Sequence, residues 1–242
     1  MASLALLYAT IFVVALLYSC VGQAGASGYI AVLTLFAFDQ ATVKPTALVL
    51  NVLVASIATY QFWRAGFFSW SLFWPFAALS IPLAFVGGYL LVSVQIFRAL
   101  VGAVLLLSAI RMIFHREESR FVRPPPLSVS LPVGAGIGLL SGVTATGGGI
   151  LLTPLLLFFR WASAKPAAAL SAAFILTNSL AALLGHFISR QPVSGTAWPL
   201  AVAAILGGLI GSRLGSRHLP ARAIHIALSA VLTVAGLKLL FG

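Results

Sequence analysis

The sequence has very few acidic residues and a single cysteine. Among 242 residues, only Asp39, Glu117 and Glu118 are acidic, and Cys20 is the one cysteine. One cysteine excludes an intrachain disulfide framework and a cysteine-rich metal site. The apolar stretches contain neither Asp nor Glu, so they lack the intramembrane carboxylates that many transporters use to relay protons or sodium.

Common enzyme motifs are absent as well. The sequence contains no His-x-x-x-His pair, no paired aspartates, no convincing Ser/His/Asp set and no Gly-Lys-Ser/Thr of a nucleotide-binding loop. We therefore predict that the chain is not an enzyme, needs no cofactor or metal, and does not hydrolyse ATP by the mechanism of such a loop.

Hydrophobic residues dominate what is present. They make up 61% of the sequence, and charged residues make up 7%, against roughly 25% in an average soluble domain. The mean hydropathy is +1.12. This composition predicts an all-α polytopic protein of the cell (inner) membrane, with the lipid bilayer as its surroundings. The net charge of +11 does not predict nucleic-acid binding here, because the basic residues lie mostly between apolar runs.

The apolar runs divide the chain into two sets of five. They span approximately residues 3–21, 28–38, 45–63, 70–92 and 96–114, and then 127–143, 148–159, 166–188, 196–216 and 221–241. Between the sets lies 115–126, the one charged and proline-rich linker. We predict a transmembrane repeat over 1–114, a cytoplasmic linker over 115–126 and a second transmembrane repeat over 127–242.

Two of these runs, 28–38 and 148–159, are too short to cross a bilayer. At about 1.5 Å per residue they fall well below the roughly 30 Å of the hydrocarbon core. Each follows a glycine-rich stretch, so we predict half-helices after broken or re-entrant segments. The remaining eight runs are predicted to be full or partial spans.

The two sets resemble each other in sequence. Gly22 to Pro45 can be aligned with Gly142 to Pro166, which pairs Gly22 with Gly142, Gly28 with Gly148 and Lys44-Pro45 with Lys165-Pro166. Trp74-Pro75 and Trp198-Pro199 continue the series. A duplication of five segments, an odd number, predicts two halves inverted in the membrane.

Basic residues indicate the orientation. A cytoplasmic linker gives that side ten of the fourteen Lys and Arg residues and leaves Lys44, Arg98, Arg190 and Lys238 on the other. We therefore predict that both termini lie outside.

The glycine-rich stretches are the predicted substrate site. A glycine break exposes the backbone amides that begin the following half-helix, and that end of a helix attracts anions. The alternative is that the glycines only let helices pack closely. The predicted residues are Gln23, Gly25, Ser27 and Gly28 in the first stretch, and Thr144, Thr146, Gly147, Gly148 and Gly149 in the second.

Three polar residues in longer apolar runs complete the prediction. Asn51, Thr177 and Asn178 are expected to face the interior of the helix bundle, because an unpaired amide in lipid is costly. They are predicted either to line the substrate route or to tie helices together.

The order of these motifs resembles that of the TauE/SafE family of sulfite exporters, also called TSUP. The resemblance rests on T-G-G-G-I-L-L-T-P at 146–154, on Lys-Pro before an Ala-rich helix, and on the glycine-rich stretch G-G-L-I-G-S-R-L-G-S-R-H-L-P-A-R at 207–222. It covers the chain from about Gly22 to Leu240. The first half departs from the pattern, with Thr34 opposite Pro154.

The resemblance implies a multi-pass inner-membrane transporter, an exporter or facilitator, for small sulfur-containing anions such as sulfite or organosulfonates. Two alternatives stay open at this point. The substrate could be another small organic anion or a thiol compound, or the chain could be a membrane scaffold without transport of its own. The oligomeric state is not indicated by the sequence.

Overall fold

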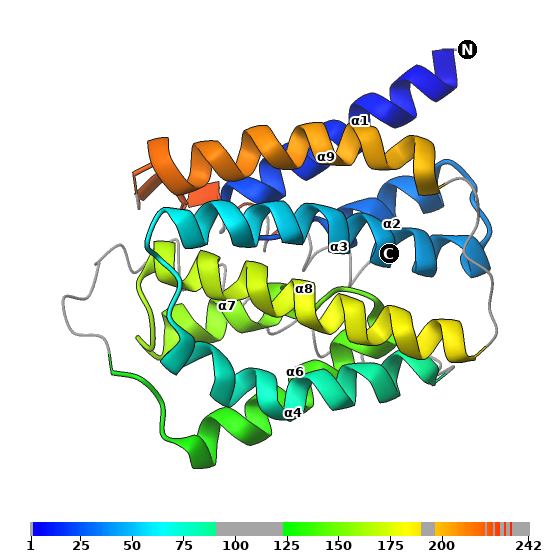
Figure 1. The fold of residues 1–242 in the computed structure, drawn as a ribbon. Coiled ribbons are helices and arrows are strands. Elements are labelled where there is room, and N and C mark those ends of the chain that lie inside the picture. Colours follow the sequence, from blue (N-terminus) through cyan, green and yellow to red (C-terminus); the bar gives the residue numbers. More distant parts are fainter. Residues whose placement is uncertain are drawn as a thin grey trace.

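The computed structural model describes residues 2–90, 123–189, 197–220 and a few positions between 222 and 233. Regular structure in these ranges is entirely helical, as predicted (Figure 1). The helices are α1 (Ala2–Cys20), α2 (Ala26–Leu35), α3 (Gln40–Arg64), α4 (Trp70–Tyr89), α6 (Leu127–Thr144), α7 (Gly149–Phe158), α8 (Ala164–Ile188) and α9 (Ala197–Arg213), which continues into the π-helical turn η1 (Leu214–His218). The predicted run 96–114, most of the linker and most of 221–241 lie outside the described residues.

Five described helices are long and apolar enough to cross a membrane. They cover Thr42–Arg64, Trp70–Tyr89, Leu127–Thr144, Ala164–Ile188 and Trp198–His218, and three shorter apolar helices accompany them. Both α2 and α7 have 10 residues, or about 15 Å. They are the two short helices that the sequence predicts after its glycine-rich stretches, and the polytopic all-α class is confirmed.

The helices of the two halves match one another in order and length. The pairs are α1 with α6, α2 with α7, α3 with α8, and α4 with α9. The loops match too, because α2 begins after Gly25 at φ 97° and α7 after Gly148 at φ 77°. This pairing differs by three residues from the alignment of Gly28 with Gly148, since the sequence comparison could not detect which glycine takes the left-handed conformation.

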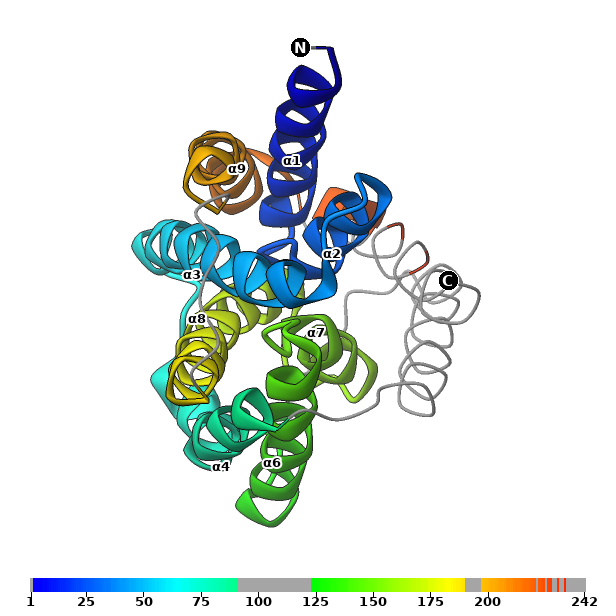
Figure 2. The same cartoon turned by 90° about the vertical axis from the view of Figure 1, so that its right-hand side faces the viewer.

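The fourth helix of each half packs against helices of the other half. The helix α4 packs along α6 and α8, and α9 packs along α1 and α3. In the end view of Figure 2, α1, α2, α3 and α9 form one group and α4, α6, α7 and α8 form the other. The central helices α3 and α8 contact each other and run antiparallel (Figure 1). That direction agrees with inverted halves, and their inversion across a membrane stays a prediction.

Rows of glycines spaced four residues apart, here called glycine ladders, form the contacts of α6 with α4 and of α9 and η1 with α1. A Cβ atom added to Gly134, Gly138 or Gly142 of α6 would overlap the carbonyl oxygens of Phe76, Ser80 and Ala84 in α4, and one added to Gly207, Gly211 or Gly215 would overlap those of Phe12, Leu16 and Cys20 in α1. Backbones that approach this closely exclude any side chain. The contacts therefore fix α4 to the second half and α9 to the first.

The ladder makes a prediction about stability. Replacing Gly138 with Ala should lower the free energy of unfolding in detergent by about 1–3 kcal/mol, because α4 and α6 must move apart. Gly136 is the matched control, since a Cβ atom there meets nothing within 4 Å. Thermal unfolding of Gly136→Ala should match the parent or exceed it slightly. Equal melting temperatures for the two variants would contradict the ladder.

Candidate substrate-binding site

Each glycine loop is covered by helices from both halves of the chain. Gly22 lies so close to α8 that a Cβ atom would overlap the backbone of Ala168. A Cβ atom on Gly147 would lie 2.9 Å from the hydroxyl of Ser179 and 3.0 Å from the amide nitrogen of Asn51. Because no water is available in a bilayer core, loop backbone at this depth has to be enclosed by protein in this way.

Gln23 ties the first loop to the beginning of α7. Its Nε2 atom donates to the carbonyl oxygen of Gly149 at 3.2 Å and to Thr153 Oγ1 at 2.7 Å. Thr153 also donates to the Gly149 carbonyl and shares a hydrogen bond with Ser171 of α8. Gln23 is 3% exposed, and Thr153 and Ser171 are fully buried, so this network joins the two halves inside the molecule.

Of the two predicted asparagines, Asn51 lies beside the second loop, and Asn178 precedes Ser179, whose hydroxyl lies at that loop. Asn51 donates from Nδ2 to Ser179 Oγ at 3.3 Å, and Asn178 accepts at Oδ1 from Ser80 at 2.8 Å. Both asparagines are 0% exposed. They therefore connect helices and at the same time form part of the polar surroundings of Gly147–Gly149.

Three buried polar atoms in these surroundings have no hydrogen-bond partner. They are Asn51 Oδ1, Asn178 Nδ2 and Ser141 Oγ. Ser141 belongs to α6, and its Cβ atom lies 3.2 Å from the position that a Cβ atom on Gly148 would take. A buried polar group without a partner costs about 1–3 kcal/mol. This polar cluster, comprising Gln23, Asn51, Ser80, Ser141, Gly147–Gly149, Thr153, Ser171, Asn178 and Ser179, is the candidate site.

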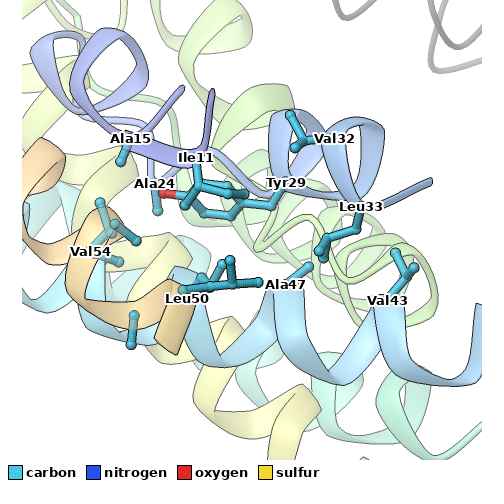
Figure 3. Close-up of a cluster of buried hydrophobic side chains, with 14 of the residues drawn as sticks. Ile11, Ala15, Ala24, Tyr29, Val32, Leu33, Val43, Ala47, Leu50 and Val54 are labelled. Carbon is cyan, nitrogen blue, oxygen red and sulfur yellow. The ribbon is translucent and has the colours of Figure 1, made fainter. Parts of the chain in front are cut away.

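The corresponding region of the first half is mostly apolar, and its buried polar atom without a hydrogen-bond partner is the hydroxyl of Tyr29. Tyr29 of α2 folds back over its own loop, with its ring atoms 3.0–3.3 Å from a Cβ position on Gly25. Figure 3 shows the ring between helices, surrounded by apolar side chains.

The residues that cap α3 and α8 give the register between the two halves. They are 124 residues apart at both ends, from Asp39 to Ser163 and from Ala65 to Ser189.

On this register Asn178 corresponds to Val54, and Ser171 corresponds to Ala47. Val54 and Ala47 both belong to the apolar cluster around Tyr29. The two loops therefore share a backbone form and differ in chemistry.

The remaining predicted residues lie apart from the hydrogen-bonded cluster. Ser27 pairs with Tyr18 at 3.1 Å, and Gly28 faces the side chain of Val14. Thr144 and Thr146 are partly buried and hydrogen-bond each other at 2.8 Å. Thr177 donates to carbonyl oxygens of its own helix. The structure thus brings together Gln23, Asn51, Gly147, Gly148, Gly149 and Asn178 from the predicted set.

Five cluster members are not among the residues predicted from the sequence: Ser80, Ser141, Thr153, Ser171 and Ser179. Single hydroxyls are common in membrane helices, where they usually bond their own backbone. The sequence signal that could have identified one of them is spacing. Thr153 follows Gly149 by four residues, so the two residues lie on the same face of α7.

The cluster is formally neutral. Its hydrogen-bonding groups are amides, hydroxyls and backbone, and the N-terminal end of α7 contributes about half a positive charge. Such surroundings suit a small anion of low charge, because they offer hydrogen-bond donors without an ion pair.

Comparison with known proteins identifies relatives over nearly the whole chain. The family model described as "Sulfite exporter TauE/SafE" matches residues 7–239. A protein of Sinorhizobium fredii named "Probable membrane transporter protein y4hK" is 43% identical over 237 residues, covering 95% of each chain. "Probable membrane transporter protein MJ0441" of Methanocaldococcus jannaschii is 25% identical over 248 residues, covering 95% of this chain and 92% of its own. No solved structure matches the chain significantly.

A double-mutant cycle tests the link between the halves. Gln23→Leu and Thr153→Val should each destabilise the protein, and their unfolding free energies should be coupled by about 0.6–1.7 kcal/mol, the range for polar pairs between membrane helices. Thr10→Val is the control partner, because Thr10 bonds only carbonyls of its own helix among its described contacts. Strictly additive effects of Gln23→Leu and Thr153→Val would contradict the bond.

Proposed function

Because the chain belongs to the TauE/SafE family of membrane transporters, we propose that it moves small sulfur-containing anions, such as sulfite or organosulfonates, through the polar cluster at Gly147–Gly149. The observation that carries this proposal is a neutral set of buried polar atoms at the start of a half-helix, three of them without a partner. The other predicted residues, Gly25, Ser27, Gly28, Thr144, Thr146 and Thr177, are secondary in this proposal.

A neutral anion site fits an uncoupled exporter. The described helices carry no Asp or Glu inside their apolar runs, so proton or sodium binding by a carboxylate is not part of the proposal. An inside-negative membrane potential favours the exit of an anion by about 2.3 kcal/mol per charge and 100 mV. The proposed setting is the inner membrane, with the central linker in the cytoplasm and both termini outside.

Vesicles containing the purified protein provide the direct test. With radiolabelled sulfite inside, we expect efflux well above that from protein-free vesicles, and a faster rate when the potential is negative inside. A panel with an alkyl sulfonate, a carboxylate and a thiol identifies the substrate class. Efflux of the carboxylate or thiol without efflux of any sulfur oxyanion would contradict the proposal.

Gly148→Leu tests the site itself. A Cβ atom at Gly148 would lie 2.9 Å from a side-chain carbon of Ile137 and 3.0 Å from one of Phe174, which is close enough to clash. We expect sulfite efflux to be abolished while membrane insertion is retained. Gly66→Leu is the matched control, because Gly66 also has a positive φ of 82° but has open space around it. Full efflux by Gly148→Leu would mean that the glycines serve only packing.

A further inference from the structure

We propose that the site takes its oxyanion in a singly charged form that still carries a proton, so that hydrogen sulfite and not the sulfite dianion is the transported species. This inference rests on the proposed function and concerns the same polar cluster. It follows from which atoms in the cluster are left without partners and from where the charged residues lie.

The unpartnered atoms include an acceptor as well as donors. Asn178 Nδ2 and the hydroxyl of Ser141 can donate, whereas Asn51 Oδ1 can only accept. A fully deprotonated oxyanion satisfies donors alone and would place a negative oxygen against Asn51 Oδ1. A ligand with an O–H group can donate to Asn51 Oδ1 while its other oxygens accept from Asn178 and Ser141.

The amide group of Asn51 lies beside the second loop. Its Nδ2 atom donates to Ser179 and lies 3.0 Å from the position of a Cβ atom on Gly147. Oδ1 is bonded to the same carbon atom as Nδ2, so it belongs to an amide group that lies at the loop. With 0% of Asn51 exposed, no bulk solvent is available to satisfy that oxygen.

Charge also favours the monoanion. The cost of transferring an ion out of water rises with the square of its charge, so a dianion costs about four times as much as a monoanion of similar size. The cluster offers neutral donors and about half a positive charge from α7. That compensation suits one negative charge and falls far short of two.

The cluster itself contains no charged or titratable side chain, and those of the surrounding described elements are as follows. They are Tyr8, Tyr18 and Cys20 on α1, Tyr29 on α2, Lys44, Tyr60 and Arg64 on α3, Tyr89 on α4, Lys165 and His186 on α8, and Arg213 on α9, and α6 and α7 have none. Lys44 precedes Asn51 by seven residues, or about 10 Å along the helix, and His186 follows Asn178 by eight, or about 12 Å. Tyr29 belongs to the apolar cluster of the first loop.

Sulfite distinguishes the two forms because it loses its second proton near neutral pH. At constant total sulfite and constant membrane potential, efflux should decrease as the pH rises and approach a tenfold loss per pH unit above that ionisation. Methanesulfonate stays a monoanion without a proton over the same range. It should move more slowly than hydrogen sulfite and with no dependence on pH. Protein-free vesicles correct for the passage of neutral sulfur dioxide.

Two substitutions test the acceptor, Asn51 Oδ1, and the donor, Asn178 Nδ2, separately. Asn51→Leu should slow sulfite efflux at mildly acidic pH at least several-fold more than it slows methanesulfonate efflux, because only hydrogen sulfite donates a hydrogen bond to Asn51 Oδ1. Asn178→Leu, the matched control, should slow both anions. If Asn51→Leu slows both anions equally, Asn51 presents its NH₂ group to the ligand and the proposal is wrong.

His186 is the other possible source of a dependence on pH, because histidine ordinarily titrates near neutrality. The His186→Gln variant should keep the pH profile of sulfite efflux if the proton belongs to the substrate. A flat profile in this variant, or sulfite efflux that rises with pH in the parent, would overturn the proposal. Those results leave the proposed function intact, whereas the absence of efflux for every sulfur anion would remove the proposed function itself.

Discussion

The backbone at the two glycine breaks must be satisfied without water, and the arrangement of the chain depends on this constraint. A broken helix in a bilayer is tolerated only where protein encloses it. The first break is pressed against Ala168 in α8, and the second is covered by Asn51 of α3 and by Gln23 beside the first break. Each half therefore completes the other, which explains why α3 and α8 are central.

The two glycine loops have the same backbone conformation but different side-chain surroundings. The left-handed glycines before α2 and α7 prepare the same exposed amides, yet Tyr29 fills the first position with an aromatic ring whereas serine, threonine and asparagine side chains surround the second. A duplicated chain can specialise in this way, because a single substitution at an equivalent position, such as Val54 opposite Asn178, removes a polar partner without altering the helices. The proposed substrate site therefore involves the second of the two loops.

The sequence was sufficient for most of the fold and for only part of the site. Hydrophobic length and glycine position predicted the short helices and the loops, because both follow from local composition. The exchange of α4 and α9 was not predictable, since it depends on glycines such as Gly138 and Gly211 meeting carbonyl oxygens far away in the chain. Gln23, Asn51 and Asn178 were identifiable as costly polar residues, whereas Ser80 and Ser171 resemble ordinary helix hydroxyls until their partners are known.

The kinds of contact differ within and between the two helix groups, and this difference bears on transport. Inside each group, glycine ladders hold backbones against backbones, as along α4 and α6. Between the groups, hydrogen bonds from Asn51 and Gln23 share the interface with the tight contact at Gly22. At Gly147 even a Cβ atom would meet the side chains of Ile175, Ser179 and Asn51, so the proposed binding there requires these side chains to move. Neutral hydrogen bonds can be exchanged for bonds to a ligand, whereas the ladders cannot open without exposing backbone. Motion that admits a ligand in the proposed transport therefore costs least around Gly147, where side-chain hydrogen bonds form the interface, and most at the backbone contact of Gly22 with Ala168.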